Sequence, residues 1–188
     1  IIQNILQKHN LPKAAVSMLP STDRALVGAM LQASDTIDVM IPRGGKGLTG
    51  RIMDEAKMPV FAHLDGNCHI YVHQSVNTAL AVDVIKNAKL RRTGICGAAE
   101  SLLFDQALDN TAAQSIVQTL LDANCTVVGD TEAQKLDPRI ESATEEDWGT
   151  EYLQSKISCK FVNDVNDAIG HINKHGSHHT DAILAEDI

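Results

Sequence analysis

Short apolar runs of strand length alternate with segments of helical apolar periodicity along this chain. A run of about four to eight apolar residues bounded by Gly, Pro or polar clusters predicts a buried strand, whereas apolar residues three and four apart predict a helix. Parallel strands need a crossover connection, and a helix is the usual one. The alternation therefore predicts an α/β fold of βαβ units around a mostly parallel sheet.

The individual elements follow from this pattern. Strands are predicted at residues 14–19, 36–41, 59–62, 69–73, 101–104, 126–128, 156–162 and 182–184. After a first helix that ends at Leu11-Pro12, helices are predicted at 21–33, 48–57, 77–90, 110–124, 131–136 and 165–175, and residues 137–150 are expected to be mainly loop. The pattern restarts after Gly66, which divides the chain into two α/β parts, residues 1–65 and 66–188.

Composition excludes several classes of protein. The 188 residues suffice to bury a core, and the net charge of −8 argues against a nucleic-acid partner because no broad basic face is available. No stretch approaches the roughly 18–20 apolar residues of a membrane span. Four cysteines stand singly, which is typical of a reducing cytoplasm and not of a disulfide framework. Since the chain opens with Ile1 and no Met, we expect a piece of a longer polypeptide.

A glycine-rich segment, Gly44-Gly45-Lys46-Gly47, connects a predicted strand to a predicted helix. Free backbone N–H groups and the helix N-terminus at such a place can bind an anion. The segment matches neither a P-loop nor the GxGxxG fingerprint of dinucleotide-binding folds. A tight strand-to-helix turn that uses glycine for its backbone alone is the alternative, and the sequence leaves both open.

Cys96 is the cysteine most suited to act as a nucleophile. Gly94 and Gly97 flank it and leave room for a substrate carbonyl, and Arg91 and Arg92 precede it, so that positive charge favours the thiolate. The same two arginines suit a substrate phosphate or carboxylate, although surface arginines at a helix end explain them equally well. Cys125 and Cys159 lie in or beside predicted strands, where a free cysteine is usually a small buried hydrophobe.

The histidines do not predict a metal site. Their spacing matches neither a zinc finger nor an HExxH helix. In a strand His69 and His73 share one face while Cys68 points to the other, and the late histidines lie in a Gly/Ser loop. We therefore expect no metal at these two groups: Cys68, His69 and His73, and His175, His178 and His179.

Several of these stretches together resemble one family. Residues 41–48, 63–72, 87–89, Cys96, 100–103 and 167–183 are similar, in this order, to the γ-glutamyl phosphate reductases, also called glutamate-5-semialdehyde dehydrogenases, of the aldehyde dehydrogenase superfamily. The resemblance implies an aldehyde dehydrogenase-like fold in a longer chain that forms a homo-oligomer. Residues 1–65 would be the C-terminal part of an NADP-binding domain, and residues 66–188 a truncated, thiol-bearing catalytic domain.

The resemblance also assigns roles to residues. Cys96 takes the place of the catalytic thiol, and Gly45 and Gly50 match the glycine pair at the cofactor helix. Glu151 matches the glutamate that holds the nicotinamide ribose. The sequence departs from the family in having Thr93 and Gly97 around the thiol.

A further difference concerns the general base. The glutamate that activates water in hydrolytic members of the superfamily falls near His63-Leu64, where neither residue is an acid. An enzyme that exchanges its acyl group with phosphate does not need such a base.

The implied reaction is the NADPH-dependent reduction of L-glutamyl 5-phosphate to L-glutamate 5-semialdehyde and phosphate, through a thioester on Cys96. It would serve proline biosynthesis in the cytoplasm, with a functional link to glutamate 5-kinase. The alternatives are another acyl or aldehyde dehydrogenase of the same superfamily, a fragment that is inactive on its own, and, more remotely, a metal-binding module.

Overall fold

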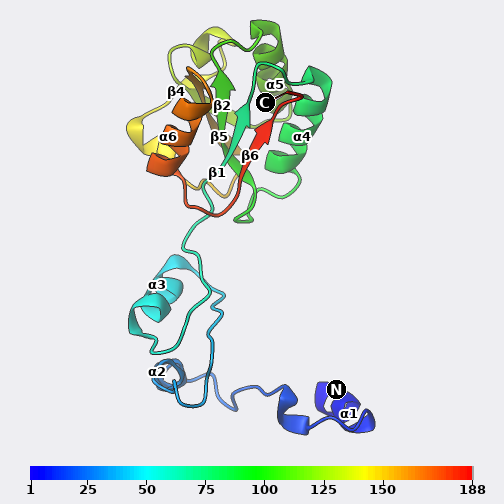
Figure 1. The fold of residues 1–188 in the computed structure, drawn as a ribbon, viewed down its shortest axis with the longest axis vertical. Helices are drawn as coiled ribbons and strands as arrows, with labels where there is room; N and C mark the ends of the chain where they lie inside the picture. The colour runs from blue at the N-terminus through cyan, green and yellow to red at the C-terminus, as the bar shows by residue number, and fades with distance from the viewer. Residues whose placement is uncertain (188) are drawn as a thin grey trace. The chain divides into compact units, whose positions relative to one another are not determined.

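The computed structural model describes residues 1–187, apart from the side chain of Lys46 in the glycine-rich segment. It forms two units, one from Ile1 to Ala62 and one from His63 onward, and each is described by itself (Figure 1). The division predicted at Gly66 lies close to this boundary. The functional assignment of the two parts stays a prediction.

The first unit is helical. Its elements are α1 (Ile2–Lys8), the 3-10 turn η1 (Lys13–Ala15), α2 (Ala25–Leu31) and α3 (Lys46–Glu55). The strand predicted at 14–19 is wrong. The segments predicted as strands at 36–41 and 59–62 do pair in parallel, but within the described residues only through one isolated bridge, between Met40 and Val60, and not as full strands. A strand needs a neighbour to satisfy its backbone groups, and here no ladder continues beyond that bridge.

The second unit is built on a six-stranded sheet with the order β4-β3-β5-β2-β1-β6. The strands are β1 (Cys68–Val72), β2 (Ala99–Asp105), β3 (Thr126–Gly129), β4 (Glu141–Ser142), β5 (Lys156–Val162) and β6 (Asp181–Leu184). Every pair of neighbouring strands is parallel. The α/β prediction of a parallel sheet is confirmed for this unit.

Helices cover both faces of the sheet. The connections are α4 (Thr78–Leu90), α5 (Asn110–Asp122) and α6 (Val165–His175), with the 3-10 turns η2 (Ala133–Lys135) and η3 (Glu145–Gly149). Ile70 and Val72 of β1 pack in the core that α4 and α5 cover, whereas Tyr71 packs in the smaller core beneath α6 (Figure 1). This alternation follows from the two-residue period of a strand.

Side chains cap the three helices of this unit. The side chain of Asn77 accepts a hydrogen bond from the N–H of Leu80 at the start of α4, and Asp109 and Asp164 cap α5 and α6 in the same way. Capping satisfies N–H groups that have no partner within the helix. No helix of the described residues has the length and apolar character to cross a membrane.

The stretch 137–150 is more ordered than predicted. It contains the short edge strand β4 and the turn η3, which begins with a capping box between Thr144 and Asp147. Trp148 in this turn is buried against the ring of His171 in α6. A single buried tryptophan thus anchors a segment whose polar composition predicted only loop.

Candidate active site

The candidate site lies at the edge of the sheet where its parallel strands begin. Because β6, β1 and β2 are neighbours, the segments that precede them meet at this edge. These segments are residues 176–180 before β6, 63–67 before β1 and 91–98 before β2. Cys96 lies in the last of them and is partly exposed, whereas the other three cysteines are buried.

The backbone of Cys96 is packed directly against Gly66. A Cβ placed on Gly66 would lie 1.8 Å from the carbonyl oxygen of Cys96 and 2.8 Å from its Cα. The thiol of Cys68 donates a hydrogen bond to that same carbonyl oxygen over 3.2 Å. The position of the Cys96 backbone is therefore held by the segment before β1 and by the first residue of that strand.

Glu151 acts on the same contact. Its carboxylate accepts a hydrogen bond of 2.8 Å from the N–H of Gly66. The glutamate predicted to hold the cofactor ribose thus contacts Gly66, which in turn packs against the backbone of Cys96. Its role toward a cofactor stays a prediction, and the structure adds a role in fixing the segment before β1.

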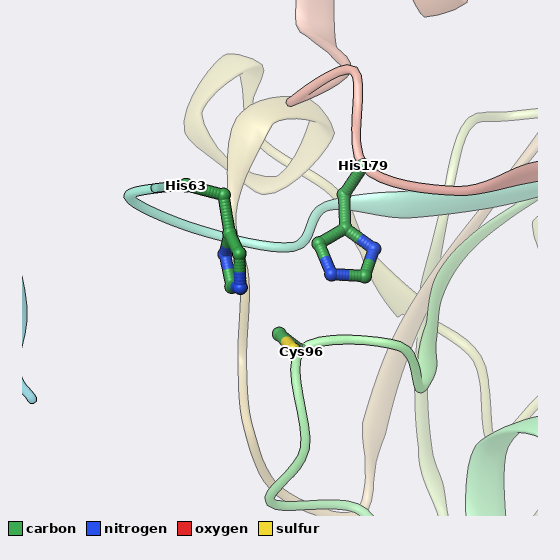
Figure 2. A group of neighbouring side chains, drawn as sticks. All are labelled: His63, Cys96 and His179. Carbon is green, nitrogen blue, oxygen red and sulfur yellow. The ribbon is translucent and has the colours of Figure 1, made fainter. Parts of the chain in front are cut away.

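Two imidazoles face Cys96. The side chains of His63, Cys96 and His179 converge from three different segments, and their potential ligand atoms all lie within 4.8 Å of one another (Figure 2). The rings of His63 and His179 meet edge to face with their centroids 4.6 Å apart. The sequence alone does not predict this pairing, because only the adjacency of β6, β1 and β2 brings residues so distant in sequence together.

The other cysteines are poor nucleophiles. Burial raises the pKa of the Cys68 thiol to about 11, with a further contribution from the charge of Asp181. Burial also raises the pKa of Cys125 and that of Cys159. The prediction that Cys125 and Cys159 are buried hydrophobes is confirmed.

A buried ion pair spans the segment that carries Cys96. Lys89 at the end of α4 and Glu100 in β2 are both fully buried, and their charged atoms are 2.5 Å apart. Glu100 also accepts a hydrogen bond from the N–H of Leu153. Burial raises the pKa of Glu100, while the Lys89 ammonium opposes this shift. The pair ties together the two ends of the segment between α4 and β2.

The remaining predicted residues lie elsewhere. Arg91 and Arg92 are exposed directly after α4, where Arg91 is the C-cap. Gly45 is the N-cap of α3 and Gly50 lies within that helix, both in the first unit. Their roles toward substrate and cofactor stay predictions.

Three of the histidines considered in the sequence are engaged in other contacts. His69 Nδ1 lies 3.1 Å from a carboxylate oxygen of Asp181, and His73 Nδ1 lies 2.9 Å from the hydroxyl of Ser75. His175 packs against the ring of His171. Among these histidines, only His179 belongs to the group around Cys96.

The amino-acid sequence matches a protein-family model and several named relatives. The aldehyde dehydrogenase family model matches residues 1–168. The chain is 50% identical over 184 residues to the γ-glutamyl phosphate reductase of Rhodopseudomonas palustris (strain TIE-1), covering 97% of this chain and 43% of that protein. It is 51% identical over 181 residues to the enzyme of the same name from Zymomonas mobilis, covering 96% of this chain and 42% of that protein.

A solved structure agrees with these sequences. The crystal structure of γ-glutamyl phosphate reductase from Thermotoga maritima matches 99% of this chain and 45% of its own, with 38% identity and a TM-score of 0.91. The chain thus spans less than half the length of the relatives that it matches. Since the family model covers most of the sequence, the chain belongs to the aldehyde dehydrogenase family.

Proposed function

We propose that the polypeptide containing this chain reduces L-glutamyl 5-phosphate to L-glutamate 5-semialdehyde and phosphate with NADPH. The observation that carries the proposal is the sequence identity of 50–51%, over nearly the whole chain, to proteins named γ-glutamyl phosphate reductase. The accessibility of Cys96 supports it, because an acyl phosphate must reach the thiol while the other cysteines are buried.

Cys96 performs the acyl transfer. Its thiolate attacks the acyl carbon of the substrate, so that a carbon–sulfur bond forms, the carbon–oxygen bond to phosphate breaks, and phosphate leaves with the bonding electron pair. A bound NADPH would supply the hydride that reduces the acyl carbon of the resulting thioester. The carbon–sulfur bond then breaks, which releases the semialdehyde and regenerates the thiolate of Cys96.

The backbone around Cys96 serves the developing oxyanion. The N–H of Cys96 is one candidate donor to this oxyanion, and oxyanion stabilisation requires a donor held in place before the reaction. Gly66, Cys68 and Glu151 provide this preorganisation through the contacts described above. Neither His63 nor Leu64, which lie near the position of the water-activating glutamate, is an acid. This agrees with a thioester that is reduced by hydride and not hydrolysed by water.

The residues present are compatible with a nicotinamide dinucleotide. The first turn of α3, which begins after Gly45 in an extended conformation, offers backbone N–H groups of the kind that bind phosphate. The carboxylate of Glu151 accepts a hydrogen bond from the N–H of Gly66, and a carboxylate can accept several hydrogen bonds at once. We assign NADP(H) as the cofactor, together with Gly45, Gly50 and Glu151 as its contacts and Arg91 and Arg92 as contacts of the substrate.

The biological setting follows from the proposed chemistry. An acyl phosphate is short-lived in water, so an acyl kinase, glutamate 5-kinase, must supply it close by. We further propose that the complete protein is a homo-oligomer that acts in proline biosynthesis in the cytoplasm.

The test uses the complete polypeptide and runs the reaction backwards. Reduction of NADP+ by glutamate 5-semialdehyde is expected to require inorganic phosphate and to disappear in Cys96→Ala, while Cys125→Ala retains activity as the matched control. Activity that persists in Cys96→Ala would contradict the thioester mechanism. Activity with other aldehydes but not with the semialdehyde would favour another member of the superfamily, and faster reduction of NAD+ would contradict the cofactor assignment.

A further inference from the structure

We propose that His63, Cys96 and His179 form a binding site for Zn²⁺ that masks the thiol. The three side chains come from the three segments that precede β1, β2 and β6, their ligand atoms lie within 4.8 Å of one another, and Figure 2 shows Cys96 between the two imidazole rings. Binding itself depends on these residues alone. Its consequence for turnover rests on the proposed function of Cys96.

The ligand types suit this ion. Zn²⁺ prefers thiolate sulfur and imidazole nitrogen in a tetrahedral arrangement, in which neighbouring donor atoms lie roughly 3.3–3.6 Å apart. The donors here lie within 4.8 Å of one another, so the widest separation must contract by up to about 1.2–1.5 Å on binding. His63 is exposed and lies in a segment outside helix and strand, so a rotation of its side chain can supply this movement.

His179 is held in an orientation suited to a ligand. Its Nδ1 lies 2.9 Å from the hydroxyl oxygen of Thr180 and 3.8 Å from the sulfur of Cys68. When Nδ1–H donates to Thr180, Nε2 keeps its lone pair free for the cation. A hydrogen bond at the second ring nitrogen is the usual support of a zinc-bound histidine.

Cys68 is not a fourth ligand. Its thiol is buried and donates to the carbonyl oxygen of Cys96, so its sulfur is engaged away from the common point of the three ligands. The site therefore has three protein ligands, and a water molecule completes the tetrahedron. When the ion binds, a sulfur–zinc bond forms, the thiol proton of Cys96 is released to solvent, and no oxidant or reductant is needed.

The consequence is reversible inhibition. A sulfur that donates its electron pair to Zn²⁺ cannot attack an acyl carbon, and a ligand exchange frees it again. Free Zn²⁺ would then inhibit the enzyme by binding at the active site itself, and no separate regulatory site would be needed.

Cobalt serves as the spectroscopic probe. The purified chain is titrated with CoCl₂, and a thiolate-to-cobalt charge-transfer band is expected together with the d–d bands of a tetrahedral site; ZnCl₂ should abolish both. Cys96→Ser should remove the charge-transfer band. His63→Gln and His179→Gln should each weaken Zn²⁺ binding by at least about tenfold, as loss of a ligand requires. His178→Asn and Cys125→Ser are the matched controls and should bind as the unmodified chain does.

Three results would overturn the proposal: no charge-transfer band in the unmodified chain, a band that persists in Cys96→Ser, or equal Zn²⁺ binding with and without the two imidazoles. The last result would leave only an isolated thiol. Circular dichroism and the fluorescence of Trp148 verify folding, and the exposed His63 offers a variant with little risk to the fold.

An independent measurement follows alkylation. Zn²⁺ is expected to slow modification of Cys96 by iodoacetamide, measured on the peptide that contains it, and to lose this effect in His179→Gln. Equal rates with and without Zn²⁺ in the unmodified chain would contradict the proposal. Because neither assay requires turnover, their failure is distinguishable from a failure of the proposed reaction.

Discussion

Replacing Gly66 by Ala tests the packing that positions Cys96. The structure places an added Cβ 1.8 Å from the Cys96 carbonyl oxygen and 2.6 Å from its carbonyl carbon, where ordinary contacts begin near 3.4 Å. The two backbones must therefore separate by about 1.5 Å. Both atoms belong to the main chain, so no side-chain rotation can relieve the contact.

The expected cost combines two effects. Overpacking of this kind destabilises a protein by about 1–3 kcal/mol. The displacement also weakens the hydrogen bond from the N–H of Gly66 to Glu151, which adds about 1 kcal/mol. The free energy of unfolding of the second unit should fall by about 2–4 kcal/mol. In the complete enzyme, a shift of this size at the nucleophile should lower kcat/KM by about 100-fold.

The assay is urea unfolding monitored by the fluorescence of Trp148, the single tryptophan, which is buried in the same unit. Gly170→Ala is the matched control: it makes the same chemical change within α6, where an added Cβ meets no atom within 4 Å. It should stabilise the unit by about 0.5–1 kcal/mol, because Ala favours helix more than Gly does. If Gly66→Ala unfolds within about 0.5 kcal/mol of the unmodified chain, the inferred close approach is wrong.

Three further predictions concern the same unit. Lys89→Met leaves the carboxylate of Glu100 buried without its ionic partner, so the free energy of unfolding in urea should fall by about 3–5 kcal/mol. Adding Glu100→Gln should recover much of this loss. A negligible loss in the single variant would contradict a stabilising ion pair. Burial lowers the pKa of His171 to about 3. Below pH 6.5 this imidazole is therefore protonated in the unfolded chain but stays neutral in the folded one, and the free energy of unfolding should fall by roughly 2 kcal/mol by pH 5. That loss should shrink in His171→Gln but not in His178→Asn when unfolding is measured at both pH values. Asp164→Ala should destabilise α6 by about 1 kcal/mol in thermal unfolding, whereas Asp164→Asn, which retains a capping oxygen, should cost little.

The second unit was predictable because its local signals agree with its packing. The structure has β5 at Lys156–Val162 and α6 at Val165–His175, with the bounds that the sequence predicts. An apolar run, a capping aspartate and an amphipathic period all favour the same elements there. Each signal lies within a few residues of the element that it specifies.

The first unit shows where such signals fail. The run Ala14 to Leu19 has the composition of a strand, yet its main chain forms no ladder, and Met18 is 92% exposed. Composition measures only whether a segment suits a half-buried pleated surface. A strand also needs a neighbour in the correct register, and no property of the segment itself provides one.

The candidate site divides in the same way. The local sequence around Cys96, with its small flanking residues, was sufficient to select this cysteine. His63 and His179 could not be associated with it, because their adjacency depends on the order in which β6, β1 and β2 lie in the sheet. Glycine at position 66 gave no sign of its close contact, since a glycine before a strand is ordinary.

The position of β6 has a consequence for the order of folding. Among the strands of the described residues, β6 is the last in sequence and pairs with the first, β1, so that the hydrogen bond from the N–H of His69 to Asp181 closes a separation of 112 residues. Pairings of such long range form late, because the entropy of closing the loop must be overcome first. During synthesis, β1, β2, β3 and β5 can associate before residues 176–184 leave the ribosome. Until residues 176–184 pair with β1, Cys96 lacks His179 beside it. Its thiol is most open to oxidation or alkylation during this stage of synthesis.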